Sequence, residues 1–140
     1  MRTAYRVLAL LIPVLVALQA ALIAFGQFGI EAWVSDDNSY TARAQEGGDA
    51  AGAVGITLHS VIGNSVIPLA ALLLLAVAFF ARVPGGRKWA AFVLLDVVVQ
   101  IVLAVLAYDV AAVGLLHGIN AFLLFGLAMM AAQRVRTAPE

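Results

Sequence analysis

Four long runs of apolar residues, separated by short polar breaks, constrain this chain more than any other feature of its sequence. The runs cover about residues 7–28, 54–81, 89–107 and 112–132. A helix of ~20 apolar residues crosses the ~30 Å hydrocarbon core of a bilayer, and in that core only helices and closed barrels satisfy their backbone hydrogen bonds. The sequence therefore predicts an all-α integral membrane protein, a single transmembrane domain over residues 1–140 with a long outer loop at 31–51.

The composition agrees with this class and excludes several kinds of site. The chain is 64% hydrophobic and 11% charged, with a mean hydropathy of +1.05, whereas a soluble domain keeps about a quarter of its residues charged. The formal net charge is zero, so nothing indicates a nucleic-acid partner. The absence of cysteine excludes disulfides, thiolate metal sites, iron–sulfur clusters and the covalent attachment of c-type haem.

The basic residues predict the orientation in the membrane. Seven of the eight fall on one side of the expected spans, and Arg43 alone falls on the other; the seven are Arg2, Arg6, Arg82, Arg87, Lys88, Arg134 and Arg136. The positive-inside rule then places both termini in the cytoplasm. The first run is longer than the 7–15-residue core of a cleaved signal peptide, so we expect it to be a retained span.

Two polar positions recur along the chain and predict an internal repeat. Gln19 lies in an apolar segment (16–24) that resembles the segment around Gln100 (97–105), 81 residues later. The only two histidines, His59 and His117, open the second and fourth runs and lie 58 residues apart. The pattern predicts a tandem repeat of a two-helix unit, giving an up-down-up-down four-helix bundle.

The two histidines are candidate metal ligands. In such a bundle they occupy diagonal helices, roughly 13 Å apart if neighbouring axes are ~8–10 Å apart. Zinc needs three or four protein ligands, whereas haem iron needs only two axial groups. The pair therefore predicts a b-type haem bound by bis-histidine ligation near the outer face. Gly63 and Gly118 would let the macrocycle approach the backbone, and Gln19 and Gln100 would bond the cofactor.

Other interpretations of the same residues remain open. The histidines and glutamines are also suited to hydrogen bonds between helices of a cofactor-free structural or interaction subunit. Gln19 and Gln100 could instead line a pocket for a quinone or another small molecule. Asp96 is an intramembrane carboxyl, which is either a proton relay or a protonated, hydrogen-bonded group. The sequence contains no nucleophile–base pair, phosphate loop or metalloprotease motif, so it does not indicate an enzyme.

Three motifs carry a resemblance to a known family. The segments Tyr5-Arg6-Val7-Leu8-Ala9, Phe80-Ala81-Arg82-Val83-Pro84-Gly85-Gly86 and Leu116-His117-Gly118-Ile119-Asn120 make the whole chain resemble a bacterial family of small four-helix membrane proteins of unknown function. This resemblance implies the bacterial cytoplasmic (inner) membrane. We expect the lipid bilayer as the partner, together with a quinone or a redox protein, and a homo-oligomer.

The placement of the histidines carries a second, looser resemblance. Histidines that open the second and fourth helices of a duplicated unit resemble those of membrane b-type cytochromes and of one four-helix half of haem A synthase. By this resemblance His59 and His117 are axial ligands. Haem A synthase also has a glutamate shortly before a histidine of the second helix, whereas residues 55–58 here are Gly-Ile-Thr-Leu.

Overall fold

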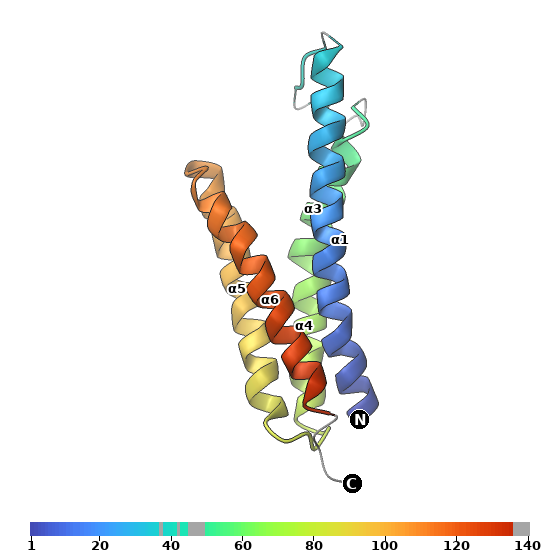
Figure 1. Ribbon diagram of the computed structural model, residues 1–140, viewed down its shortest axis with the longest axis vertical. Helices are drawn as coiled ribbons and strands as arrows, with labels where there is room; N and C mark the ends of the chain where they lie inside the picture. Colours follow the sequence, from blue (N-terminus) through green and yellow to red (C-terminus); the bar gives the residue numbers. More distant parts are fainter. Residues whose placement is uncertain (37, 42, 45–49, 136–140) are drawn as a thin grey trace. The chain divides into compact units, whose positions relative to one another are not determined.

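The computed structural model describes residues 1–36, 38–41, 43–44 and 50–135. Within these ranges the chain is helical and contains no β-strand. In chain order the elements are α1 (Arg2–Ser35), α3 (Ala53–Val61), the π-helical segment η1 (Ile62–Val66), α4 (Ile67–Ala78), α5 (Gly86–Asp109) and α6 (Val113–Gln133) (Figure 1). The predicted all-α class is confirmed.

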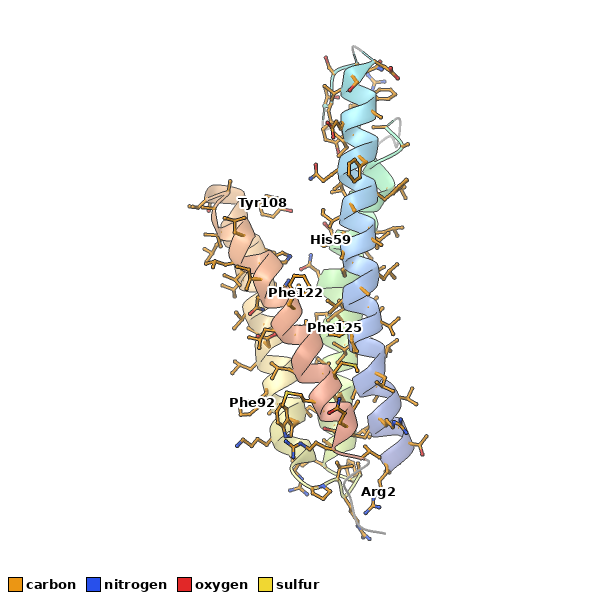
Figure 2. The ribbon with its side chains drawn as sticks, viewed as in Figure 1. Arg2, His59, Phe92, Tyr108, Phe122 and Phe125 are labelled. Carbon is orange, nitrogen blue, oxygen red and sulfur yellow. The ribbon has the colours of Figure 1, made fainter. Side chains whose placement is uncertain are left out.

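Four helices in the described ranges are long and apolar enough to cross a membrane. They are α1, the continuous stretch Ala53–Ala78 formed by α3, η1 and α4, then α5 and α6. Many of their large apolar side chains are exposed, for example Phe122 on α6 at 82% and Leu115 at 72% (Figure 2). Leaving such a side chain in water costs ~1.5–3 kcal/mol relative to burial, and lipid tails remove that cost. The chain is a multi-pass membrane protein.

The first helix is longer than the apolar run that predicts it. It begins at Arg2 instead of residue 7 and ends at Ser35 instead of residue 28, so part of the expected outer loop is helical. In its last turn the Ser35 hydroxyl donates to the carbonyl of Glu31 at 2.8 Å. Polar side chains end a hydropathy run without ending a helix, because the backbone hydrogen bonds continue where these side chains reach water or headgroups.

The second span is interrupted by a π-helical turn. Residues Ile62–Val66 form η1, and Pro68 follows at the start of α4. Proline has no backbone N–H, and its ring would clash with the carbonyl four residues earlier, which is that of Asn64. The wider π-turn gives that carbonyl room, and π-turns of this kind are frequent at functional sites. Hydropathy alone predicts an unbroken helix over 54–81.

The described residues group into two compact units. Unit 1 contains Met1–Val16 and the chain from Asn64 onward, and unit 2 contains Ala17–Gly63.

In unit 2, the backbones of α1 and α3 meet at four glycines. Gly26 and Gly29 lie one turn apart on α1, and Gly52 and Gly55 are equally spaced at the start of α3. A Cβ on Gly29 would lie 2.5 Å from the amide nitrogen of Gly52, and one on Gly55 would lie 2.7 Å from the carbonyl oxygen of Leu22. These neighbours are backbone atoms and cannot rotate away. The glycine contact (Gly26, Gly29, Gly52, Gly55) therefore depends on the absence of side chains.

In unit 1, α5 lies beside both α4 and α6 (Figure 1). The buried apolar side chains of these helices are those of small residues together with five larger ones, Ile67, Leu74, Val93, Val97 and Leu124. Small residues let membrane helices approach closely and gain dispersion contacts. The first turns of α1 join this unit through Tyr5, which is fully buried and donates its hydroxyl to the carbonyl of Gly86 at 3.1 Å.

Candidate functional site

In unit 2, Gln19 and His59 form a pair of reciprocal hydrogen bonds between α1 and α3. The side-chain amide of Gln19 donates to the backbone carbonyl of His59 at 3.1 Å. In return, Nδ1 of His59 lies 3.1 Å from the backbone carbonyl oxygen of Gln19. Gln19 is buried and His59, labelled in Figure 2, is half-buried. Each residue thus fixes the other across the two helices.

In unit 1, Gln100 and His117 make the same two hydrogen bonds between α5 and α6. The amide of Gln100 donates to the backbone carbonyl of His117 at 3.1 Å. Nδ1 of His117 lies 3.0 Å from the backbone carbonyl oxygen of Gln100. Each histidine therefore contacts the glutamine of the helix that precedes it in the sequence. We call these two arrangements the Gln–His pairs.

The hydrogen bond at Nδ1 determines the form of both histidine rings. A carbonyl oxygen only accepts a hydrogen bond, so Nδ1 of His59 and of His117 must carry the proton and donate it. In the neutral ring, the lone pair is then on Nε2. This is the form and orientation in which histidine binds a metal, because most metal-bound histidines donate their other ring N–H to a carbonyl, a carboxylate or water.

The pair in unit 1 extends into a larger polar network. The amide nitrogen of Gln100 also lies 3.3 Å from Nε2 of His117. The side chain of Asn120 donates to Oε1 of Gln100 at 2.8 Å and to the backbone carbonyl of Asp96 at 3.5 Å. The side chain of Gln100 on α5 therefore contacts three polar groups of α6. Leu15 lies 81 residues before Asp96, the same separation as between Gln19 and Gln100, so the pair in unit 2 has no carboxyl at the corresponding distance from its glutamine.

Two buried polar atoms of the described residues lack a hydrogen-bond partner. They are Oε1 of Gln19 and Oδ2 of Asp96. A buried acceptor without a donor costs ~1–3 kcal/mol, and such atoms are expected where a water molecule or a ligand completes the site. Each belongs to a different unit, beside one of the two Gln–His pairs.

The two glycines expected to admit a cofactor differ from each other. A Cβ on Gly63 would lie 3.0 Å from the amide nitrogen of Gln19, whereas a Cβ on Gly118 would meet no atom within 4 Å. Gly63 therefore accommodates the side chain that contacts His59. Gly118, next to His117, leaves open space beside the second histidine.

The sequence did not reveal which residues pair: it left the glutamines to the cofactor or to hydrogen bonds between helices, and the histidines to the metal or to such bonds, without joining each glutamine to a histidine. The available signal was depth, since Gln19 and His59, like Gln100 and His117, fall at similar depths on consecutive helices. In the described part of the chain, no three His, Cys, Asp or Glu side chains group together as a metal site. A metal held by these histidines would need other ligands, such as those of a macrocycle.

No protein-family model, no curated protein and no solved structure matches this chain.

The two glutamines are expected to differ in their contribution to stability. Leucine at Gln100 removes three side-chain hydrogen bonds, each worth ~0.6 kcal/mol in a membrane, so unit 1 should lose about 1–2 kcal/mol. Leucine at Gln19 removes one such bond together with an unpartnered buried oxygen, whose burial costs ~1–3 kcal/mol. Its effect on unit 2 should lie between neutral and stabilising.

The two tryptophans allow each unit to be followed separately. Trp33 is in unit 2 and Trp89 is in unit 1. In a Trp89→Phe background the remaining Trp33 therefore reports on unit 2, and in a Trp33→Phe background the remaining Trp89 reports on unit 1. Unfolding in mixed detergent micelles, followed by tryptophan fluorescence, gives the free energy of each variant. Equal destabilisation by the two leucine substitutions would contradict the expected difference.

Proposed function

We propose that this chain is a haem-b-binding membrane protein in which His59 and His117 are the axial ligands, acting in electron transfer or haem handling near the outer face of the bacterial cytoplasmic membrane. The observation that supports it most is the hydrogen bond from Nδ1 of each histidine to a backbone carbonyl. This bond places the lone pair on Nε2 and fixes the ring orientation, as at bound histidines in metalloproteins. A haem iron needs at most two axial ligands from the protein, so no third protein ligand is required.

We further propose that the chain is a tandem repeat of two helix pairs in an up-down-up-down bundle, with both termini in the cytoplasm. The Gln–His pairs support the repeat, because each copy makes the same two hydrogen bonds at corresponding positions. The basic residues support the orientation, since seven of eight lie on one side of the spans. A repeat of this kind supplies one histidine from each half.

A bound b-type haem supplies one-electron transfer, so the partner would be a quinone or a redox protein. The chain's own residues would position the two histidines. Leu115 and Phe122 on α6 are apolar and exposed in the described structure, as lipid-facing side chains are. Asp96 is a candidate proton relay for such a reaction, supported by its burial and by the unpartnered Oδ2.

The test of the haem proposal is a visible absorption spectrum of the purified full-length protein, expressed with added haem and recorded oxidised and then reduced with dithionite. We expect a Soret band and a sharp α-band in the reduced state, as six-coordinate low-spin haem gives. A protein that stays colourless after haem reconstitution, while folded by circular dichroism, would overturn the proposal.

A second candidate is a cofactor-free structural or interaction subunit of a membrane complex, in which the Gln–His pairs only hold helices together. The amide nitrogen of Gln100 favours it, because this donor lies 3.3 Å from Nε2 of His117 and engages the lone pair that a metal would need. The same spectrum separates the two functions, since this candidate predicts no haem bands under any reconstitution condition.

A further inference from the structure

A cavity of about 400 Å³ lies where α4 ends and α5 begins, entirely within unit 1. Its lining combines three cationic side chains with an aromatic ring and two glycines: Arg82, Arg87, Lys88, Phe79, Gly85 and Gly86. The haem proposal uses none of these residues. Among the residues that the structure describes, no acidic side chain lines the cavity, so this lining is electropositive.

The turn that forms this cavity has an unusual backbone. Gly85 has a φ of 69° and Arg82 a φ of 51°, both in the left-handed region. Glycine adopts this conformation freely, but arginine rarely does. Non-glycine residues held there are strained and concentrate at ligand-binding segments. The backbone conformation places Arg82 in the lining together with the cations of α5.

The cations are held in place by the protein but are not neutralised by it. The guanidinium of Arg87 lies 5.0 Å from the centre of the Phe79 ring and donates to the carbonyl of Phe79 at 3.4 Å. The ammonium of Lys88 lies 5.5 Å from the centre of the Phe92 ring (Figure 2). Aromatic faces attract cations without removing their charge. Among the described acidic side chains, none forms an ion pair with Arg82, Arg87 or Lys88.

The start of α5 adds to the positive potential. The helix begins at Gly86 without a side-chain cap. The N–H of Gly86 itself donates to the carbonyl of Val83 at 2.9 Å, but the positive end of the helix dipole still favours an anion here. Arginine and lysine side chains together with helix N-terminal amides are the groups that bind phosphate oxygens. We infer that this cavity binds the phosphate of an anionic phospholipid headgroup.

The position of the cavity in the chain favours a lipid as the source of the phosphate. The cavity lies at the ends of two membrane-spanning helices, which is the level of the headgroups. Beside it, Phe79 and Phe80 are exposed at 54% and 71%, so an acyl chain attached to the phosphate would meet apolar surface. Basic pockets between membrane helices bind anionic headgroups in this way.

The test uses the fluorescence of Trp89, whose indole would lie 3.7 Å from a Cβ at Gly85, one of the residues that line the cavity. The full-length Trp33→Phe protein is placed in phosphatidylcholine nanodiscs with increasing mole fractions of phosphatidylglycerol. We expect a saturable change in Trp89 emission with phosphatidylglycerol. The Arg87→Gln substitution should raise the half-saturating mole fraction at least about fivefold, because a charge-assisted bond to phosphate is stronger than a bond from a neutral amide.

Two further variants make the result specific. Arg82→Asn, which suits the left-handed backbone, should weaken the response as Arg87→Gln does. Arg6→Gln removes an exposed arginine of α1 that does not line the cavity and should change the half-saturating fraction by less than about twofold, as a peripheral charge does. The site would be overturned if Arg87→Gln and Arg6→Gln raised the half-saturating mole fraction equally. It would also be overturned if Trp89 emission in nanodiscs of phosphatidylcholine alone equalled the emission at saturating phosphatidylglycerol. Saturation of the signal by inorganic phosphate alone would overturn the assignment to a lipid headgroup.

Discussion

Alanine at either His59 or His117 is expected to abolish the low-spin haem spectrum of the reconstituted protein. Each histidine supplies one axial nitrogen in the proposed site, and the loss of either converts a six-coordinate haem to a five-coordinate, high-spin haem. Removing a residue that only orients a ligand weakens metal binding by ~10–100-fold, so the loss of a ligand itself should weaken haem binding by more than about 100-fold. The reduced α-band and a haem titration measure the two effects.

The glutamines provide the matched control for these variants. In both Gln–His pairs, Nδ1 donates to the backbone carbonyl of the glutamine, and a side-chain substitution leaves that acceptor in place. Gln19→Leu and Gln100→Leu should therefore retain the low-spin bands. Added imidazole should restore them in the two alanine variants, because it replaces the missing ring. Bands that survive both alanine substitutions would show that the iron has other ligands.

The membrane spans could be predicted from hydropathy because lipid leaves the backbone few alternatives. Each apolar run must be helical to satisfy its own N–H and C=O groups, so α5 and α6 differ from the predicted 89–107 and 112–132 by at most a few residues. The last two turns of α1, up to Ser35, were missed because Glu31 interrupts the apolar run and a polar segment follows Ser35. The η1 turn was missed because it depends on how the carbonyl of Asn64 avoids Pro68.

The candidate site could be predicted only in part. Gln19, His59, Gln100 and His117 were identified because a polar residue in an apolar span is costly unless it has a role. Their pairing required the rotation of each helix about its axis, which a sequence with almost uniformly apolar faces does not specify. Hydrogen bonds to backbone carbonyls, which decide the ring tautomers, leave no pattern of residue types at all.

The glycine contact in unit 2 could not be predicted from the sequence, because it depends on how α1 and α3 pack. Its signal was present as two Gly-x-x-Gly motifs, 26–29 and 52–55, but glycine in a span is also compatible with an open surface. Gly118 and Gly126 on α6 are such cases, since a Cβ at either would meet no atom within 4 Å. The contact also affects the proposed haem site, because it fixes the separation of α1 and α3 within one to three turns of the Gln19–His59 pair.

Alanine at Gly52 is expected to destabilise unit 2 by about 3 kcal/mol or more. The backbone of Gly52 has φ −72° and ψ −19°, which any residue adopts, so the effect comes from the added methyl group alone. Its Cβ would overlap the carbonyl oxygen of Gly26 and lie 2.6 Å from the amide nitrogen of Ile30. Backbone atoms can relieve such contacts only if α1 and α3 move apart, and the cost lies at the upper end of the ~1–3 kcal/mol found for overpacked interiors.

The measurement is unfolding in mixed micelles followed by Trp33 in the Trp89→Phe background, because Trp33 lies in unit 2 one turn after Gly29. The control is Gly126→Ala, which makes the same chemical change. Its unfolding is monitored by the fluorescence of Trp89 in the Trp33→Phe background. At that open position, alanine gains up to ~1 kcal/mol of helix propensity, so stability should be unchanged or higher. If Gly52→Ala were as stable as Gly126→Ala, α1 and α3 could not be in backbone contact. The movement of α1 away from α3 should also separate Gln19 from His59. Gly52→Ala should therefore weaken haem binding, although it changes no atom of Gln19 or His59.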